Sequence, residues 1–313
     1  MTTETKHEAK PFLKWAGGKG QLINQIKEFL PSEIVAAKQI EKYFEPFVGG
    51  GAVFFWLSKN YSIKKAYLYD INPEIILAYR TIRDDVRELI NELKRLEGQY
   101  SKFSKFQREV FFYARRTEYN DYISEKIENH CVRRAALMIF LNKTCFNGLF
   151  RVNSQGLFNV PFGRYENPTI CDENNLHAVS AVLQHAVIEA GDFEYCLKKT
   201  DANSLVYFDP PYRPISKTAS FTGYIKKGFN DKDQKRLKKA CDELSKIGAK
   251  VILSNSDPKN VDPDDNFFEE LFRQKRYKID RLKAARMINC NSEKRGMIHE
   301  ILVRNYMLFK ESK

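Results

Sequence analysis

The sequence lacks the segments that mark membrane and secreted proteins. Its longest apolar run, from Ala135 to Leu141, is far shorter than the roughly 18 to 20 residues that a membrane span needs. The N-terminal segment MTTETKHEAKPF is polar and mixed in charge, without the apolar stretch of a secretory signal. We therefore expect no membrane helix and a cytoplasmic location.

Cysteine and histidine are few and scattered. The six cysteines lie at least 14 residues apart, and the five histidines show no metal-ligand spacing, so neither a zinc site nor a CxxC redox motif is indicated. We expect free, mostly buried thiols and no bound metal. Low-complexity tracts are also missing, and the composition excludes collagenous and coiled-coil proteins.

Positive charge is in excess. The 313 residues include 52 Lys and Arg against 40 Asp and Glu, a formal net charge of +12, and 43% of the residues are hydrophobic. The surplus lies in two zones, 81–164 with net +5 and 271–313 with net +8. Such zones favour a polyanion, because neutralised phosphates release counterions. A solvated surface that merely keeps the protein soluble has the same composition, so charge alone leaves both interpretations open.

The chain opens with a β-α-β-α pattern. Helical spacing over 19–30 ends at Pro31, and the apolar segment 43–48 runs into three glycines and a second helical stretch. A strand that ends at Asp70 follows, and then a helix after Pro73, since proline suits the first helical turn. This alternation predicts an α/β fold with a doubly wound, mostly parallel sheet.

The alternation is then interrupted. Charged, aromatic-rich helical segments fill 83–141, and 142–163 carries Asn-Gly and Gln-Gly between β-favouring residues, as a hairpin or ordered loop does. We therefore expect an inserted, mainly helical domain that carries a β-hairpin. The sheet resumes with strands at 186–190, 204–209 and 249–255, a helix at 231–248 and a closing strand at 298–306.

The sharpest local motif is VYFDPPY, in which Asp209, Pro210, Pro211 and Tyr212 follow an apolar strand. The two prolines stop the strand and leave a carboxylate, a carbonyl and an aromatic face at its carboxyl end, where open α/β sheets place ligands. These groups suit a planar amine substrate. An ordinary Asp-Pro turn with a core tyrosine would have the same four-residue sequence.

A second motif is the glycine turn EPFVGGGAVFF. Phe47, Gly49 and Gly51 follow a strand and open a helix, where glycine lets the backbone approach a ligand closely. Phe54 replaces the last glycine of GxGxxG, so a dinucleotide site is poorly supported, whereas Asp70 ends the next strand and is placed to accept hydrogen bonds from ribose hydroxyls. An adenosine-like cofactor is indicated. Alternatively, the glycines form a plain tight turn and Asp70 caps a helix.

A third motif, KWAGGKGQL, places Trp15 beside Lys14 and Lys19. It is not a phosphate-binding P-loop, because Gly20 stands where Ser or Thr must follow the lysine. ATP hydrolysis is therefore disfavoured. The aromatic face of Trp15 suits a sulfonium cation or an adenine ring.

These segments, in this order, resemble the Dam-like family of DNA adenine methyltransferases, which includes the modification enzymes of GATC restriction systems. The resemblance spans nearly the whole chain. KWAGGK together with FNGLFR and FNVPFGRY is highly specific, whereas DPPY is shared with other aminomethylases. The other matching segments are YFEPFVGGGAVFF, YLYDINPE, GDF, ASFTGY, VILSNSD and RGMIHEILV.

The resemblance implies a site-specific, adenine-specific DNA methyltransferase with the Rossmann-like fold of enzymes that use S-adenosylmethionine and release S-adenosylhomocysteine. Residues 1–80 and 165–313 would form the catalytic domain, with the recognition domain 81–164 inserted in the alpha arrangement. Asp209 and the Pro210 carbonyl would accept the two hydrogens of the adenine 6-amino group, and Tyr212 would stack on the flipped-out base. The implied cofactor residues are Trp15, Lys19, Glu45, Phe47, Gly49, Gly51, Asp70, Asp192 and Asp209.

The same resemblance implies a DNA reader. The residues that match the family's base-reading hairpin and its supports are Lys14, Phe146, Asn147, Leu149, Arg151 and Pro161. The expected partner is double-stranded DNA at GATC, read by a monomer. A companion restriction endonuclease would be the functional partner in restriction protection, and a Dam-like housekeeping role is the alternative. Arg151 by itself is also consistent with a surface cation on a hairpin.

Other functions compete with this interpretation. A related fold methylates glutamine or RNA, and the recognition block argues against both. A catalytically idle DNA-binding subunit would have no need for Asp209, Tyr212 and the glycine turn together. An endonuclease would depend on the acidic run Asp262, Asp264 and Asp265, which lacks a lysine at useful spacing and is more typical of a solvated loop.

Overall fold

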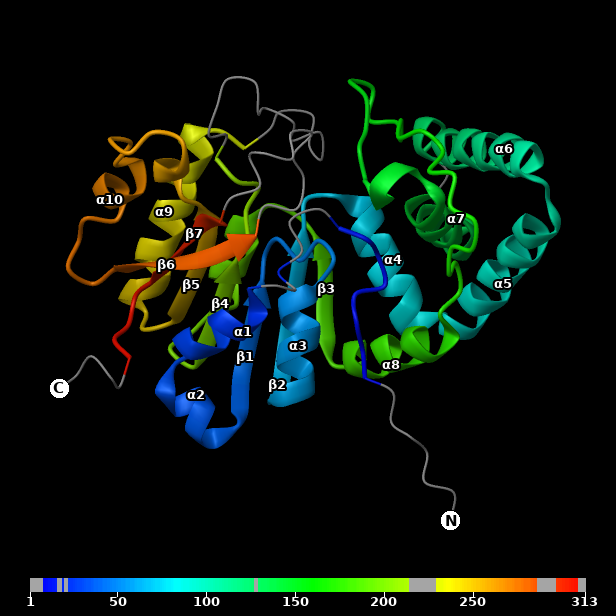
Figure 1. Cartoon of the computed structure of the whole chain (residues 1–313). Helices are drawn as coiled ribbons and strands as arrows, with labels where there is room; N and C mark the ends of the chain where they lie inside the picture. Colours follow the sequence, from blue (N-terminus) through cyan, green and yellow to red (C-terminus); the bar gives the residue numbers. More distant parts are fainter. Residues whose placement is uncertain are drawn as a thin grey trace, which may run out of the picture.

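A seven-stranded sheet forms the centre of the molecule (Figure 1). The computed structural model describes residues 8–15, 19, 22–126, 129–213, 229–285 and 297–308. The strand order is β3-β2-β1-β4-β5-β7-β6. Neighbours among β1 to β5 pair in parallel, and β7 pairs antiparallel with both β5 and β6. The predicted doubly wound, mostly parallel α/β fold is therefore confirmed.

The bounds of the elements follow the chain. The strands are β1 Gln39–Glu45, β2 Ser62–Asp70, β3 Ala186–Ala190, β4 Ser204–Phe208, β5 Lys250–Ser256, β6 Lys278–Ala285 and β7 Met297–Arg304. The α-helices are α1 Ile23–Ile26, α2 Ser32–Ala37, α3 Ala52–Asn60, α4 Pro73–Asp84, α5 Val86–Lys102, α6 Lys105–Ser124, α7 Cys131–Thr144, α8 Glu173–Leu183, α9 Asp231–Lys246 and α10 Phe267–Leu271. Short 3₁₀ helices span Lys27–Phe29, Phe146–Gly148, Phe193–Lys198 and Pro258–Asn260.

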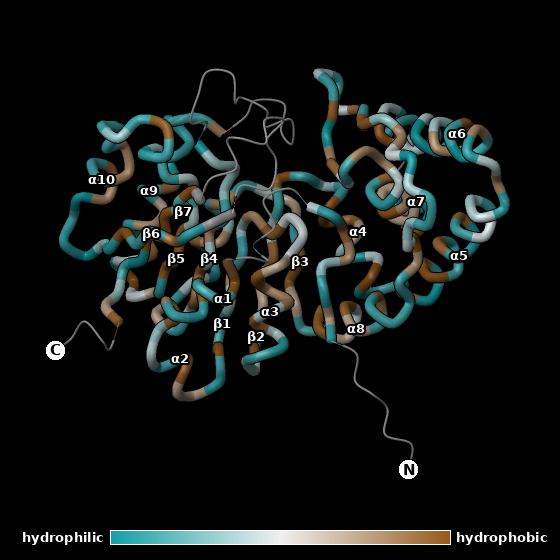
Figure 2. Tube along the Cα trace, in the orientation of Figure 1, coloured by the Kyte–Doolittle hydropathy of each residue, from teal (hydrophilic) through white to brown (hydrophobic). Residues whose placement is uncertain are grey.

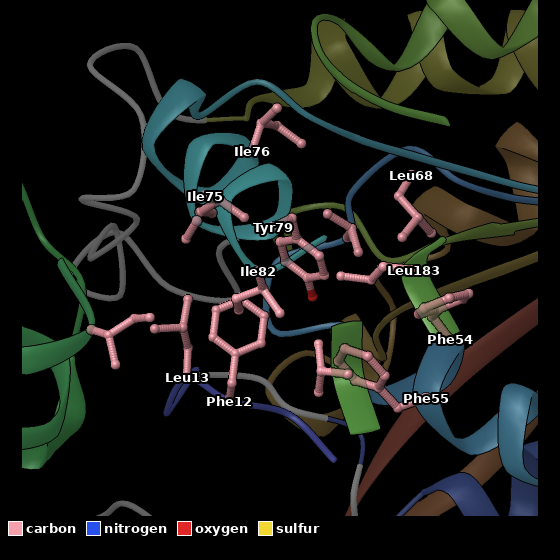
Figure 3. Packing of buried hydrophobic residues seen from close by; sticks show 14 of the residues in the cluster. Phe12, Leu13, Phe54, Phe55, Leu68, Ile75, Ile76, Tyr79, Ile82 and Leu183 are labelled. Atoms are coloured by element: carbon pink, nitrogen blue, oxygen red, sulfur yellow. The ribbon is translucent and has the colours of Figure 1, made fainter. Parts of the chain in front are cut away.

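The sheet buries both of its faces, as parallel sheets do. Because successive strand residues point to opposite faces, Tyr43 and Tyr207 belong to a core with α3, α4 and α8, whereas Phe44 and Phe208 belong to a second core with α9 and α10. Hydrophobic residues accordingly gather along the central strands (Figure 2). In the first core the Tyr79 ring lies edge-on to Phe12 at 4.9 Å between ring centroids (Figure 3).

The predicted order of the first strands and helices is correct, but some of their predicted bounds are wrong. The predicted strand over 43–48 is β1, which starts four residues earlier and ends at Glu45, because Pro46 has no N–H to continue the ladder. The helix predicted over 19–30 begins only at Ile23 and tightens into a 3₁₀ turn before Leu30 becomes extended. The helix after Pro73 is confirmed as α4, and Asn72 caps it by accepting from the Glu74 N–H at 3.0 Å.

The described residues of 83–141 form the end of α4, α5, α6 and most of α7, joined by short non-helical turns, which confirms the predicted helical segments. The anchor of this segment to the sheet is Glu74 of α4, which is 6% exposed. The Glu74 carboxylate accepts from Arg134 Nε at 2.7 Å and from the Tyr119 hydroxyl at 3.1 Å. One buried acid therefore joins the start of α4 to α6 and α7.

The predicted hairpin starts later than expected. Helix α7 extends to Thr144, so the first three residues of 142–163 are helical rather than part of a hairpin. The remainder is an ordered loop with two antiparallel bridges, Cys145 with Phe162 and Val152 with Phe158. The hairpin path is confirmed, but it contains no extended ladder.

Candidate active site

Three acidic residues stand at the carboxyl ends of neighbouring parallel strands. Glu45 ends β1, Asp70 ends β2, and Asp209 directly follows β4. The chain order reverses beside β1, since β2 and β3 lie on one side of it and β4 and β5 on the other. Open α/β sheets bind their ligands at such a switch point.

The glycine turn lies at this edge, between β1 and α3. Gly49 and Gly51 have φ of 46° and 69°, a region that favours glycine, and Gly51 is the N-cap of α3. The predicted strand, turn and helix are therefore confirmed. A Cβ on Gly49 would lie 2.6 Å from Trp15 Nε1, and one on Gly50 would lie 2.9 Å from Trp15 Cβ. Trp15 therefore packs directly on the glycine turn, and a side chain at Gly49 or Gly50 would clash with it.

Asp70 links two loops by accepting hydrogen bonds from their backbone N–H groups. Its Oδ2 accepts from the Gly49 N–H at 3.0 Å and its Oδ1 from the Asn72 N–H at 2.9 Å. Burial raises the pKa of Asp70 to about 6, against the lowering effect of these N–H groups. The next residue, Ile71, is 47% exposed and gives this edge an apolar surface. The ribose contact predicted for Asp70 stays a prediction.

Asp209 is the centre of a buried polar cluster. Its Oδ1 lies 3.0 Å from Lys19 Nζ and accepts from Ser254 Oγ at 3.0 Å. Burial raises the pKa of Asp209, and the Lys19 charge opposes that rise. Lys19 Nζ also lies 3.1 Å from Glu300 Oε2 and 4.2 Å from the centre of the Tyr212 ring. The family resemblance predicts that Lys19 contacts the cofactor, and the structure brings Lys19 against the DPPY turn.

Glu45 lies beneath this cluster and is 3% exposed. Its Oε2 accepts from the Tyr43 hydroxyl at 2.7 Å. Burial, with a further contribution from the nearby Asp209 charge, raises the pKa of Glu45 to about 8. Glu45 therefore holds a proton at neutral pH, which limits the negative charge beneath the site.

An aromatic wall continues from the glycine turn toward the end of β3. Phe47 stacks on Phe193 at 5.5 Å between ring centroids and meets Phe229 edge-on at 5.7 Å. Asp192 caps the 3₁₀ helix by accepting from the Glu194 N–H, and it is paired with Arg236 at 2.8 Å. Planar apolar rings beside a carboxylate suit an adenine ring, and the cofactor role of Phe47 and Asp192 stays a prediction.

The residues expected to read DNA lie mostly at the surface. Phe146 is 51% exposed, and its N–H donates to the Pro161 carbonyl at 2.9 Å across the loop. Asn147 and Pro161 are exposed, and Leu149 is half-buried. Asn147 also has a positive φ of 54°, which turns the chain sharply at the tip.

Arg151 and Lys14 are held in place by asparagines. Arg151 Nε donates to Asn159 Oδ1 at 2.8 Å. Asn142, which is 1% exposed, accepts from the Lys14 N–H at 2.8 Å and donates to the Lys14 carbonyl at 2.9 Å. The N-terminal segment is therefore fixed to the base of the hairpin, and the structure brings Lys14 to the recognition loop. Their contacts with DNA bases stay predictions.

Some predicted features lie outside the described residues. They are the segment 219–224 (ASFTGY), residues 16–18 of KWAGGK, Cys290, and the first two residues of RGMIHEILV. Within the described residues, no helix is long and apolar enough to cross a membrane, and no group of three or more His, Cys, Asp or Glu side chains could hold a metal. Of the cysteines there, Cys145, Cys196 and Cys241 are buried, Cys171 is half-buried and Cys131 is exposed, so most of these thiols are buried as expected.

Sequence reasoning missed the two partners of the Asp209 cluster. Ser254 belongs to the VILSNSD segment and Glu300 to RGMIHEILV, and neither was given a role. Ser254 follows the apolar residues of β5, whereas Glu300 precedes those of the antiparallel strand β7. Both therefore lie toward the same sheet edge, and that position was the available signal. Ser254 of β5 and Glu300 of β7 therefore extend the Asp209 cluster beyond the turn after β4, where the DPPY motif placed it.

This combination defines the class of protein. A doubly wound sheet with a glycine turn after β1, an acidic residue at the end of β2 and a proline-rich acceptor turn after β4 is a Rossmann-like methyltransferase fold. The chain belongs to the D12 class N6 adenine-specific DNA methyltransferase family, which matches residues 15–288.

Curated relatives agree with the family. The chain is 49% identical over 302 residues to the type II methyltransferase M.MjaIII of Methanocaldococcus jannaschii, covering 96% of this chain and 100% of that protein. It is 37% identical to the type II methyltransferase M1.LlaDCHI of Lactococcus lactis, covering 98% and 99% of the two chains. It is 32% identical to the DNA adenine methylase of Escherichia coli, covering 94% of each.

Proposed function

We propose that this protein transfers a methyl group from S-adenosylmethionine to the 6-amino group of an adenine flipped out of double-stranded DNA. The observation that carries the proposal is the acceptor turn after β4. Lys19 and Ser254 both bind Oδ1 of Asp209, and among the described residues no hydrogen bond reaches Oδ2. A carboxylate oxygen therefore remains for an incoming amine.

The residues around the glycine turn fit the cofactor. Trp15 lies against Gly49, Phe47 and Phe193 form a flat apolar wall, and Ile71 is exposed beside Asp70. Asp70 and Asp192 supply carboxylates for ribose and adenine. When bound, S-adenosylmethionine supplies an electrophilic methyl group.

The catalytic turn would act on the nucleophile. The 6-amino nitrogen of adenine is a weak nucleophile, because its lone pair is delocalised into the ring. If Asp209 and the Pro210 carbonyl accept its two hydrogens, the nitrogen becomes pyramidal and its lone pair points at the methyl group. Orientation of this kind supplies much of the acceleration. Flipping the base costs a few kcal/mol, which stacking on Tyr212 would partly offset.

The direct test is transfer of radiolabelled methyl groups to unmethylated duplex DNA by the wild-type and Asp209→Ala proteins. We expect label in DNA with the wild-type protein and none above background with the variant. Methylation by Asp209→Ala at the wild-type rate would remove Asp209 from the chemistry. Binding of DNA without methyl transfer by the wild-type protein would favour an idle DNA-binding subunit.

We further propose GATC as the target. The support is the recognition block, in which Asn147, Leu149 and Arg151 lie exposed or half-buried on one loop. The exposed Lys14 of the N-terminal segment packs against Gly148 of that loop. An arginine that binds guanine through two hydrogen bonds would supply discrimination at one base pair. Sequencing of modified bases in an unmethylated plasmid after incubation with the enzyme tests this target, and modification at another sequence would replace it.

The arrangement also supports a monomer in which 81–164 is the recognition insert. Helices α5, α6 and α7 lie beside the sheet as a separate layer (Figure 1). A palindromic site read one strand at a time needs one chain, so light scattering should give a mass near 36.6 kDa. Two relatives are named type II methyltransferases, which favours protection against a companion endonuclease over a housekeeping role. Resistance of methylated DNA to that endonuclease would test the pairing.

A further inference from the structure

We propose that Ser254 and Glu300 are positioning residues, which fix the Asp209 carboxylate so that Oδ1 is occupied by the protein and Oδ2 faces the substrate amine. The inference rests on the proposed methyl transfer to adenine. It assigns roles to two strand residues that lie outside the DPPY turn, and it changes the role expected for Lys19.

Ser254 holds the carboxylate from the neighbouring strand. Phe208 of β4 pairs with Leu253 of β5, so the residue after each, Asp209 and Ser254, lie side by side. Ser254 is 2% exposed, and its Oγ donates to Asp209 Oδ1 at 3.0 Å. The Tyr207 hydroxyl lies 3.1 Å from the same Oγ. The Phe208 carbonyl is a second acceptor for this hydroxyl at the longer distance of 3.4 Å. Asp209 Oδ1 is the nearer acceptor, so the hydroxyl offers its hydrogen to that one carboxylate oxygen.

Lys19 binds the same oxygen. Its side chain is 3% exposed, and its Nζ lies 3.0 Å from Asp209 Oδ1. A buried cation paired with one carboxylate alone would neutralise it and weaken it as an acceptor. Glu300, 3.1 Å from Lys19 Nζ, shares the cation and so leaves negative charge on Asp209.

Glu300 also positions Tyr212. The Tyr212 hydroxyl donates to Glu300 Oε2 and accepts from Lys19 Nζ. The Tyr212 ring is therefore held at its hydroxyl by hydrogen bonds, and Pro210 and Pro211 restrict the backbone before it. Glu300 lies on β7 opposite Ser256 of β5, so the central strands set the distance between this carboxylate and the turn.

The test compares steady-state methylation by four variants in the full-length protein. Ser254→Ala removes the hydroxyl, and Glu300→Gln keeps the shape and removes the charge. The matched controls are Ser180→Ala, a buried serine on α8, and Glu269→Gln, a paired surface acid. We expect kcat to fall about tenfold to hundredfold for the first two variants, since misplacement of a reacting group by about 1 Å can cost that much. The KM values for DNA and S-adenosylmethionine should stay within about twofold of wild type.

A further variant separates positioning from folding. Ser254→Thr keeps the hydroxyl and should recover most of the wild-type kcat, whereas a purely structural role would be met as well by alanine. If Ser254→Ala does not fold, Glu300→Gln carries the test. Wild-type kcat in both Ser254→Ala and Glu300→Gln, with Asp209→Ala inactive, would overturn this inference and leave the proposed function intact. Absence of methyl transfer by the wild-type protein would instead remove the proposed function.

Discussion

The edge of the sheet that carries Asp209 and the loop that carries Arg151 are built in different ways. Around Asp209 the polar partners are buried, with Lys19 3% and Ser254 2% exposed. At the loop, Phe146 is 51% exposed, and the described contacts hold Arg151 to one residue, Asn159. Under the proposed function, the groups that would meet the same amine in every turnover are fixed before binding, whereas the groups that would read the DNA sequence remain accessible. Rate and site preference should therefore be separable by mutation.

The largest expected effect is on rate, at the buried edge. Asp209→Asn keeps the size of the side chain and removes the charge, so methylation should fall roughly 10²- to 10³-fold, as for other preorganised electrostatic groups. The ratio of rates on GATC and on single-base variants should not change. Single-turnover assays on both DNAs measure this, and altered site preference would show that the two regions are coupled.

The second-largest effect should be a loss of stability at the junction between α4 and helices α6 and α7. Glu74→Ala leaves Arg134 and Tyr119 without their shared acceptor, and breaking a buried ion pair costs roughly 3 kcal/mol or more of unfolding free energy. Urea denaturation measures the loss. The control Glu189→Ala breaks the exposed pair with Lys199 and should cost less than about 1 kcal/mol. Equal losses would contradict the assignment of Glu74 as the anchor.

Site preference should change at the loop. Arg151→Ala should lose roughly 1 to 3 kcal/mol of discrimination at one base pair, with a small effect on the maximal rate. Arg164, an exposed cation of the same basic zone, is the control, because loss of a phosphate contact weakens binding to all sequences alike. Unchanged preference in Arg151→Ala would remove it from the reading residues.

The smallest effect, when it is measured per pH unit, is a pH dependence of stability that comes from Glu45. Its folded pKa of about 8 lies above the usual 4.5, so the folded state binds more protons between these values. The stability of the wild-type protein should therefore fall, relative to Glu45→Gln, as pH rises from about 4.5 to 8, by at most about 1.4 kcal/mol per pH unit. Unfolding curves of both proteins at pH 5, 7 and 9 measure the difference, and parallel pH dependence would contradict a buried, protonated Glu45.

The parts of the fold that the sequence predicts well are the buried ones. Strands β3, β4 and β5 each contain an apolar run, AVI, LVYF and VIL, because the faces of a parallel sheet are covered. Strand β6, KIDRLKAA, was missed because charged residues interrupt its apolar ones. Strand β1 begins with Gln39, and its first residues alternate in burial, so its start was placed too late. Helix α8, ENNLHAVSAVL, gave too short a periodic pattern beside the hairpin block.

The candidate site also contains some residues that the sequence predicts and others that it does not. Residues of one motif, such as Gly49, Gly51 and Asp209, can be predicted from spacing, because a turn after a strand fixes their place. Ser254 and Glu300 meet Asp209 only through strand pairing across the sheet, which no local pattern encodes. Lys19 reaches the same cluster from the other end of the chain, and only the tertiary fold brings it there.

In the proposed reaction, Asp209 and its turn direct a methyl group to an exocyclic adenine nitrogen. The decisive measurement is nucleoside analysis by mass spectrometry, after incubation of unmethylated plasmid with the purified protein and S-adenosylmethionine. We expect N6-methyladenine with the wild-type protein and none with Asp209→Ala. Methylated cytosine in place of methylated adenine, or no modified base at all, would contradict it.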